Sequence, residues 1–568
     1  MKTKNFKRVL ALLLATIMVL SMTACGGKGG KDDKKTGSNV SAEIPDYMNM
    51  ESQMPIVKEG TDITLKVLIV CGPMYSNMDS IHEVYFVDAY EERTGVKIEW
   101  EEVSSSAFSD QLALMLTTGD LPDIILKGGC SNSTQLKYGR QGYFLDLMEG
   151  GLLETFAPNF WALTQQYPEI LASSMMPDGE VYSLGMVRNS TGSAVASRMF
   201  FNQKWLDKLG LSVPKTADEL YNVLYQFKNG DPNGNGRADE IGMYLSTSHL
   251  QYLTFGMFGI GNRGAENNFI DWDDEAEKVR YFPTSEGFRE WVEYVTKLYQ
   301  EGLLNKEYFD FTETNLGNHV KNDVCGAFGY TNLCMLDEET KQNFTYLQGA
   351  LEGANGDKDY YGTKALGATG AFIITTACEY PEVALRWADY FYSDEGSLFF
   401  YYGDEDVTYN ALDDGTYEFN DEVMADFHNG TNSFDGCAVY VSLYGYGNTP
   451  TMTKVPFNSA DDNHGIALKA AEAVIEDCVI AWPAFTFTSD EQVIMEDIRA
   501  EIDKYVTFTR DSWIMGTAEL NDDTWNQFVD TINNMGLEEV LQVYEDALQR
   551  AYDAGFEEGY HTLDEFDK

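Results

Sequence analysis

One stretch of the sequence, Asp231 to Glu240, has the residue types and the spacing of a cation-binding loop. Oxygen-bearing side chains stand at positions 1, 3 and 5, and Gly236 at position 6 permits the sharp turn of an EF-hand-type loop. Position 12, usually a glutamate, is Gly242, so earlier carboxylates would have to close the cage. The candidate ligands of a structural calcium ion are Asp231, Asn233, Asn235, the carbonyl of Arg237, Asp239 and Glu240. The spacing alone fits a solvated Asn-Gly turn equally well.

Another set of residues has the chemistry that binds a sugar, which needs aromatic rings for its apolar faces and polar groups for its hydroxyls. The chain has 34 Tyr and 32 Phe, and three stretches, 267–272, 440–446 and 482–485, combine aromatic with polar residues or a Trp-Pro turn. Tyr75, which follows the first expected strand, is a further candidate, because open α/β sheets bind ligands at strand ends. The candidates are Tyr75, Asn268, Phe269, Trp272, Tyr444 and Trp482. For any single one of them, a place in the core is the commoner role.

Catalytic motifs are absent from the sequence. The six His form no HExxH or similar cluster, and there is no GxSxG elbow, P-loop or dinucleotide fingerprint. Eight scattered Cys, none in a CxxC pair, indicate neither a disulfide framework nor a zinc ribbon. Adjacent acidic pairs such as Asp273-Asp274 are expected by chance among 91 Asp and Glu. We expect no enzymatic activity, and an exported glycoside hydrolase or lyase is the alternative.

The net charge excludes one class of partner. With 91 acidic and 40 basic residues among 568, the formal charge is -51. A chain without a basic surface is a poor ligand for nucleic acid, and anionic lipid headgroups would repel it. A strong net negative charge of this kind typically keeps an exported protein in solution.

The N-terminus indicates export and a lipid anchor. A basic stretch precedes an apolar run from Val9 to Leu20, which is too short to span a bilayer and fits a signal peptide. Small residues before Cys25 and glycines after it resemble a bacterial lipobox, which implies a signal peptide over 1–24 and lipidation of Cys25. The residues that follow are rich in Gly, Lys, Asp and Ser, and we expect a flexible tether over 25–58.

Hydrophobic patterns predict an α/β fold. Alternating apolar residues from Ile63 to Ile69 predict a strand, followed by a helix over 81–94, a strand over 96–102, a helix over 108–118 and a short strand over 124–126. This order is typical of a lobe with parallel strands. Later segments with helical spacing predict further helices, for example after the capping residue Thr216.

Several short segments, taken in order, resemble the extracellular solute-binding protein family 1, and especially its branch that binds alginate and other oligosaccharides. They are the turn Gly119-Asp120-Leu121-Pro122-Asp123, the segment 177–184, the block 202–216, the helix end 299–303 and the Pro-Glu helix that begins at Tyr380. The resemblance covers nearly the whole mature chain. It implies a two-lobed periplasmic-binding-protein-like fold (type II), with α/β lobes joined by a hinge. Lobe 1 is expected over 59–186 plus 326–376, and lobe 2 over 187–325 plus 377–568.

The same resemblance implies a function. It predicts the extracellular substrate-binding component of an ABC importer, which captures an oligosaccharide in a cleft between the lobes and presents it to the permease subunits. It also favours calcium over a plain turn at 231–240, because the alginate-binding relatives have a shortened loop of this form. The expected location is the outer face of the cell membrane, held there by the lipid alone. A receptor for a solute other than a sugar remains an alternative.

Overall fold

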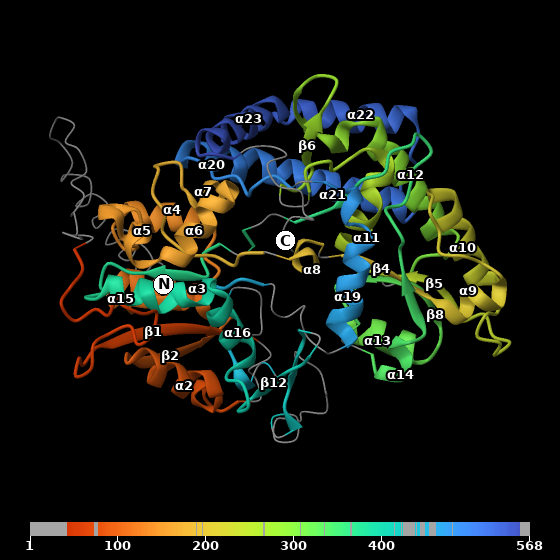
Figure 1. Cartoon of the computed structure of the whole chain (residues 1–568). Helices are drawn as coiled ribbons and strands as arrows, with labels where there is room; N and C mark the ends of the chain where they lie inside the picture. Colours follow the sequence, from red (N-terminus) through yellow and green to blue (C-terminus); the bar gives the residue numbers. More distant parts are fainter. Residues whose placement is uncertain are drawn as a thin grey trace, which may run out of the picture. The chain divides into compact units, whose positions relative to one another are not determined.

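The computed structural model describes residues 43–556, apart from 73–77, 189, 196, 265–266, 307, 310, 334–335, 364–365, 368, 414, 422, 424–437, 439, 444–448, 454–461 and 480. The expected signal peptide, Cys25 and residues 26–42 lie outside the described residues, as do Tyr75 and Tyr444. The described part contains two four-stranded sheets, each covered by helices (Figure 1). The fold is α/β and two-lobed, as the resemblance implied.

The first sheet has the strand order β11-β3-β1-β2, with β1 and its neighbours parallel and β11 antiparallel at the edge. Strand β1 is a nearly continuous apolar run, as expected for a strand that is covered on both faces. Leu68 and Val70 point to helix α3, whereas the alternate residues face a layer that contains Trp387 of α15. The strands of this sheet are β1 (Thr64–Cys71), β2 (Lys97–Ser104), β3 (Ile124–Leu126) and β11 (Phe372–Ile374).

Helices from two distant parts of the sequence cover the first sheet. Figure 1 shows α15 and α16 beside the much earlier β1, β2 and α2. The predicted helix over 108–118 is confirmed as α3, which ends where Gly119 adopts φ 75°, a left-handed conformation that suits glycine. The helices are α2 (Tyr85–Thr94), α3 (Phe108–Thr118), α4 (Asn132–Arg140), α5 (Leu152–Phe156), α6 (Pro158–Gln166), α7 (Pro168–Ser174), α15 (Pro381–Asp389) and α16 (Asp394–Tyr402).

The second sheet has the order β5-β8-β4-β9 and mixes directions: β8 is parallel to β5 and antiparallel to β4. Its two central strands are buried along almost their whole length. One face contributes Met199 and Phe201 to a large core, and the other contributes Phe200 and Phe328 to a smaller core. The strands are β4 (Arg198–Asn202), β5 (Ile241–Tyr244), β8 (Cys325–Tyr330) and β9 (Phe344–Tyr346).

Helices and short strand pairs surround the second sheet. The Thr216 hydroxyl accepts a hydrogen bond from the backbone N–H of Glu219 at 3.1 Å, so the predicted cap begins α10. The helices are α8 (Thr191–Ala194), α9 (Gln203–Leu209), α10 (Ala217–Asn229), α11 (Thr247–Thr254), α12 (Glu286–Gln300), α13 (Glu313–Lys321), α14 (Glu338–Lys341) and α19 (Asp462–Glu472). The strand pairs are β6 (Ile270–Asp273) with β7 (Lys278–Tyr281), β10 (Tyr360–Tyr361) with β14 (Cys478–Val479), and β12 (Tyr409–Ala411) with β13 (Tyr417–Phe419).

The C-terminal helices extend the large core. Helix α21 packs along α12, and α23 lies against β7 and also reaches α7. Phe288, Trp291 and Val295 of α12 are fully buried there. These helices are α20 (Ser489–Ile494), α21 (Ala500–Ile514), α22 (Asp522–Asn534) and α23 (Leu537–Asp553).

Three segments of the chain run side by side at Val187. Its backbone bridges Leu366 in an antiparallel manner and Met452 in a parallel manner. The segment of Val187 leads from the first sheet to β4, that of Leu366 leads from β10 to β11, and that of Met452 leads from α16 to α19. The two sheets are therefore connected by three segments of the chain rather than by one.

Three expectations about boundaries are wrong. Residues 43–58, which the sequence placed in a flexible tether, are folded: Met48, Ile56 and Val57 are buried, and the Ile56 N–H donates to the Thr94 carbonyl at 2.9 Å. Residues 326–330 were expected in lobe 1, but they form β8, whose buried positions fit between β4 and β5. Residues 381–402 were expected in lobe 2, but α15 and α16 pack on the first sheet through aromatic contacts.

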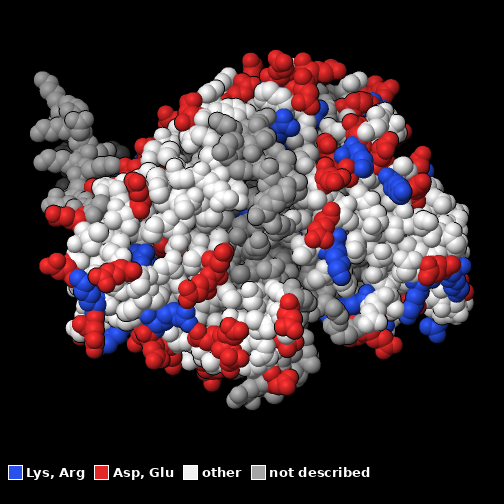
Figure 2. All heavy atoms as spheres, in the orientation of Figure 1, with Lys and Arg blue, Asp and Glu red and all other residues white. Residues whose placement is uncertain are grey.

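The surface is acidic, as the sequence predicts, and Figure 2 shows that Asp and Glu outnumber Lys and Arg on the face in view. Over the described residues, none of the helices has both the length and the apolar character needed to cross a bilayer.

Candidate functional site

The loop from Asp231 to Glu240 links α10 to β5 and keeps the internal bonding of a tight loop. The Asp231 carboxylate accepts from the Gly236 N–H at 3.2 Å, the Asn233 side chain from the Asn235 N–H at 3.0 Å, and the Asn235 side chain from the Arg237 N–H at 2.7 Å. Gly236 adopts φ 71°, as a position-6 glycine requires. The oxygens at positions 1, 3 and 5 are thus drawn toward the inside of one turn.

The two carboxylates at the end of this loop, those of Asp239 and Glu240, differ from each other in their surroundings. Hydrogen bonds from the amides of Asn235 and Asn233 hold the pKa of Asp239 below its usual value. Glu240 is only 1% exposed, and its Oε1 atom has no hydrogen-bond partner among the described atoms. A buried carboxylate oxygen without a partner is costly, so the residues present fit a bound cation. Within the described residues, no three His, Cys, Asp or Glu side chains already form a metal cage.

A lysine also lies at this loop. The Lys208 ammonium donates to the backbone carbonyls of Asp231 at 3.0 Å and Pro232 at 2.9 Å, so it fixes the outside of the turn. Lys228 donates likewise to the Glu240 carbonyl at 2.6 Å. Both ammonium groups bond backbone oxygens, which leaves the side-chain oxygens of Asp231 and Glu240 for another partner.

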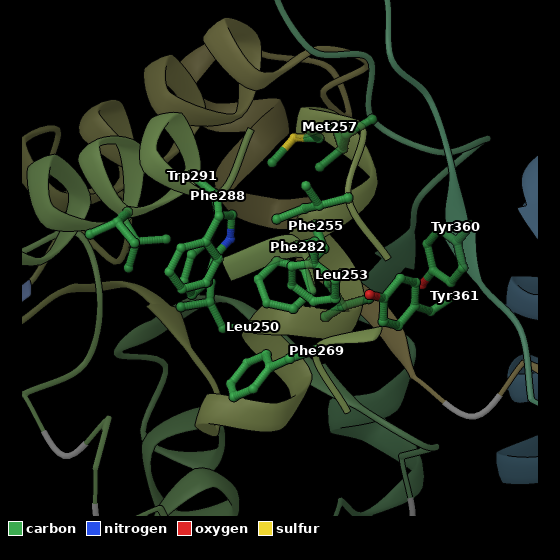
Figure 3. Close-up of a cluster of buried hydrophobic side chains, with 14 of the residues drawn as sticks. Leu250, Leu253, Phe255, Met257, Phe269, Phe282, Phe288, Trp291, Tyr360 and Tyr361 are labelled. Carbon is green, nitrogen blue, oxygen red and sulfur yellow. The ribbon is translucent and has the colours of Figure 1, made fainter. Parts of the chain in front are cut away.

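Two of the predicted sugar-binding aromatics are core residues. Phe269 is 3% exposed, and its ring is packed edge-on against Tyr281, Phe282 and Phe288. Figure 3 shows it among the buried side chains of the large core. Trp482 is 0% exposed and contacts Trp272 and Phe485. Neither ring has a free face on which a sugar can stack in this structure.

The other two described candidates retain accessible surface. Trp272 on β6 is half-buried, with its ring centroid 6.2 Å from that of Trp482. Asn268 is exposed, and its carbonyl accepts a hydrogen bond from Arg499. Asn268 stands in the loop just before β6, the strand that carries Trp272.

Three half-buried rings that the sequence analysis did not single out meet at the second sheet. They are His249 on α11, Phe311 just before α13 and Tyr330 at the end of β8, and we call them the ring triad. The centroid of His249 lies 5.6 Å from that of Tyr330 and 6.5 Å from that of Phe311. The Phe311 and Tyr330 rings are 6.4 Å apart and inclined by only 26°. The triad stands at the carboxyl ends of the parallel strands β5 and β8.

Local structure explains each position in the ring triad. Ser246 caps α11 by accepting from the His249 N–H at 3.2 Å, and Thr312 caps α13 directly after Phe311. Tyr330 pairs with Arg198 in the β4–β8 ladder. Nothing in the local sequence unites these residues, since they come from three separate elements. Only the order of the strands in the sheet could have indicated that they meet.

The ring triad carries no positive charge at neutral pH. Burial lowers the pKa of His249 to about 4, and its Nδ1 atom lies 2.9 Å from the Ser197 hydroxyl. The Tyr330 hydroxyl donates to the exposed carboxylate of Glu313. An uncharged aromatic surface therefore stands beside hydroxyl and carboxylate groups.

A buried arginine holds the chain around the ring triad. The Arg198 guanidinium donates to the carbonyls of Ala467 at 2.8 Å, of Thr331 and of Gly192, and it is almost completely buried. Burial lowers the pKa of Arg198 to about 10. One side chain thus ties the end of β8 to α8 and α19.

Comparison with known families matches residues 77–397, more than half of the chain, to the family described as bacterial extracellular solute-binding protein. The chain belongs to this family. The fold described above accompanies this match: two sheets joined by three connecting segments.

Two bacterial relatives are similar to this chain in sequence. The fructooligosaccharide ABC transporter substrate-binding protein FusA of Streptococcus pneumoniae serotype 4 is 28% identical over 568 residues, covering 96% of this chain and 98% of FusA. Lipoprotein LipO of Bacillus subtilis strain 168 is 26% identical over 319 residues, covering 53% of this chain and 58% of LipO.

Solved structures of relatives share the fold. FusA in complex with kestose superposes with a TM-score of 0.67 at 24% identity, covering 87% of this chain and 100% of FusA. A FusA EF-hand mutant with fructo-nystose gives 0.66 at 23%, again over 87% and 100%. An HMO binding ABC-transporter associated solute binding protein from Bifidobacterium longum infantis gives 0.69 at 24%, over 87% and 99%.

Proposed function

We propose that the chain is the substrate-binding lipoprotein of an ABC importer for an oligosaccharide, of the size class of kestose and nystose. The observation that carries this proposal is the match to FusA over 96% of the chain. The two sheets connected at Val187 support it, because ligand held by both halves would favour the closed state and so report occupancy to a transporter.

Binding without chemical change is the expected activity. Isothermal titration of the purified chain with kestose, nystose and cellotriose tests it, with micromolar affinity expected for at least one saccharide. Chromatography of the same mixtures after a long incubation tests the alternative. Intact ligand supports a receptor, whereas shorter products identify a glycoside hydrolase or lyase. Absence of binding to every saccharide, with binding of a peptide or polyol instead, would assign another solute.

The accessible candidates from the sequence belong to this proposal. Asn268 and Trp272 are the described residues of that set with surface open to a ligand. Tyr75 and Tyr444 lie outside the described residues and remain predictions. Phe269 and Trp482 are removed from the set because both are buried.

A lipid anchor at Cys25 is the second part of the proposal. The lipobox-like residues before Cys25 support it, and so does the likeness to LipO, which is named a lipoprotein. The folded residues 43–58 leave 26–42 as the stretch between the anchor and the first sheet. Labelling cells with a palmitate analogue tests the anchor: Cys25→Ala is expected to lose the label and to appear in the medium.

Calcium at 231–240 is the third part, supported by the unpartnered oxygen of Glu240 and by the likeness to FusA, of which an EF-hand mutant has been solved. When bound, a calcium ion would supply positive charge at the centre of the loop. Asp231, Asn233, Asn235, the Arg237 carbonyl, Asp239 and Glu240 would hold it. Calcium in place of EGTA is expected to raise the melting temperature by about 3–6 °C, from preferential binding to the folded chain.

Matched variants locate that effect. Glu240→Gln is expected to remove the calcium-dependent rise, because it deletes the buried charge of a proposed ligand. Asp530→Asn removes an exposed carboxylate from α22 and is expected to leave the rise intact. A rise that survives in Glu240→Gln and in Asp231→Asn would place the ion elsewhere.

A further inference from the structure

The ring triad is the outer layer of an aromatic group whose inner members are fully buried. Tyr244 and Phe328 lie behind it at 0% exposed, and the Tyr244 and Phe311 centroids are 5.5 Å apart. Phe311 and Tyr330 pack on this small core but keep part of their surface accessible. We propose that His249, Phe311 and Tyr330 form a stacking subsite for one uncharged sugar ring, an inference that rests on the proposed function.

The geometry of Phe311 and Tyr330 favours a flat ligand. Their rings come from different elements, yet they are nearly parallel, inclined by only 26° with centroids 6.4 Å apart. The imidazole of His249 stands at an angle to both, 51° to the Tyr330 ring and 62° to the Phe311 ring. A sugar ring has an apolar face of C–H groups that suits aromatic rings and an edge of hydroxyls that needs polar partners.

Polar groups of the right kind border the rings. The Glu313 carboxylate, which accepts from the Tyr330 hydroxyl, has further capacity to accept from sugar hydroxyls. The hydroxyls of Ser246 and Ser248 lie 3.0 Å apart at the start of α11, the helix that carries His249. Hydroxyls and a carboxylate around an aromatic face form the arrangement that orients a carbohydrate rather than a purely apolar guest.

The charges around the ring triad select against an anionic sugar. His249 is neutral above about pH 4 because burial depresses its pKa, and Glu313 is a negative neighbour. The guanidinium of Arg198, on the residue paired with Tyr330, is directed to three backbone carbonyls. A uronate placed on the rings would lose water around its charge and face a carboxylate, whereas a neutral ring would not.

The competing explanation is that these rings only complete the core. Leucine separates the two explanations, because it fills a similar apolar volume but has no flat face. Phe309 is the matched control: it is an exposed ring two residues earlier, in contact with Tyr299 and Tyr308 instead of the triad. Phe311→Leu and Tyr330→Leu should melt within a few degrees of wild type and bind saccharide differently from Phe309→Leu.

The test is titration calorimetry of the full mature chain with kestose, nystose and a trimer of galacturonic acid. For Phe311→Leu and Tyr330→Leu we expect a dissociation constant about five- to tenfold higher for the neutral saccharide, and for Phe309→Leu one within about twofold of wild type. We expect the galacturonate trimer to bind at least about tenfold more weakly than the neutral trimer. Equal affinity in Phe311→Leu, Tyr330→Leu and Phe309→Leu overturns the subsite, and so does tighter binding of galacturonate.

A measurement on the unaltered chain is independent of folding effects. Tetranitromethane nitrates accessible tyrosines, and saturating saccharide is expected to lower nitration of Tyr330 several-fold. Tyr225 on α10, which is 44% exposed, is the internal reference and should be nitrated equally with and without ligand. Saccharide binding without protection of Tyr330 overturns the subsite while the proposed function stands. Failure of the wild-type chain to bind any saccharide overturns the proposed function itself.

Discussion

Two aromatic regions around the second sheet differ in how much of their ring surface is exposed. Around Phe269 and Trp482, the rings cover one another and form the interior of the large core. In the ring triad, buried rings support an outer layer that is only partly covered. The first region was expected to bind ligand because its sequence is rich in aromatic and polar residues, whereas the second has no local pattern at all.

The difference shows that exposure is decided by the place of a residue in the sheet and its helices. Phe269 adopts φ 64°, a left-handed conformation that is uncommon outside glycine, and its ring joins the core. Tyr330 instead ends a central strand, so its ring has no further strand residue to cover it. The following experiments test this contrast.

The largest effect is expected from Phe269→Ala, which removes a fully packed ring from the core. The free energy of unfolding should fall by about 3–5 kcal/mol, as for other buried phenylalanines, while the molecules that remain folded bind saccharide normally. Denaturant unfolding measures the loss, and titration at low temperature measures the affinity. Normal stability combined with lost affinity would return Phe269 to the binding site.

The next largest expected effect is a pH dependence of the free energy of unfolding, and it distinguishes the ring triad from the core. The pKa of folded His249 is about 4, below the unfolded value of about 6.5, so the folded chain favours the neutral imidazole. The His249 contribution to stability is therefore full above pH 6.5, and at most about 3 kcal/mol is lost as pH falls toward 4.

His249→Gln is the comparison, since glutamine does not titrate. The difference in unfolding free energy between wild type and His249→Gln should change between pH 6.5 and 4.5 and stay constant above pH 7. Ser197, Phe311 and Tyr330 face the imidazole, and the Tyr330 hydroxyl donates to the carboxylate of Glu313. A difference that does not vary with pH would mean that the imidazole is well hydrated.

A smaller effect is expected at the accessible edge of the first region. Trp272 is half-buried against Trp482, so Trp272→Leu removes a partly accessible ring. Saccharide affinity should fall about fivefold, less than for both ring-triad variants combined. Titration calorimetry decides this, and unchanged affinity would assign Trp272 to the core together with Phe269.

The smallest effect is expected from Tyr330→Phe, which keeps the ring and deletes the hydroxyl that donates to Glu313. An exposed hydrogen bond of this kind contributes little, so affinity should fall about twofold and stability by less than about 1 kcal/mol. A tenfold loss of affinity would show that the hydroxyl, rather than the ring face, holds the sugar.

Local patterns in the sequence predicted individual elements well. The helix over 108–118 and the strand over 124–126 appear with the expected bounds, because apolar spacing and glycine stops are local signals. The family-like turns pointed to the two-lobed fold. The assignment of 326–330 and 381–402 failed, since a buried strand such as β8 has the same pattern in either sheet and only its partners decide its place.

The candidate site was predicted less completely for the same reason. The loop at 231–240 could be found because its six candidate ligands lie within ten consecutive residues. The ring triad could not, because β4, β8 and two helix starts must assemble before its rings meet. Phe269 and Trp482 were chosen by residue type, and type alone does not reveal which rings the core will cover.

The triple connection at Val187 has a consequence for protease sensitivity and for sensor design. A cut in any one connecting segment leaves the halves linked covalently by the other two, so a nicked molecule should migrate intact until it is denatured. Three connecting segments also resist twisting better than one. The motion of the two halves relative to each other is therefore mainly a bending. A pair of fluorescent dyes, one on each half, would then report a single angle.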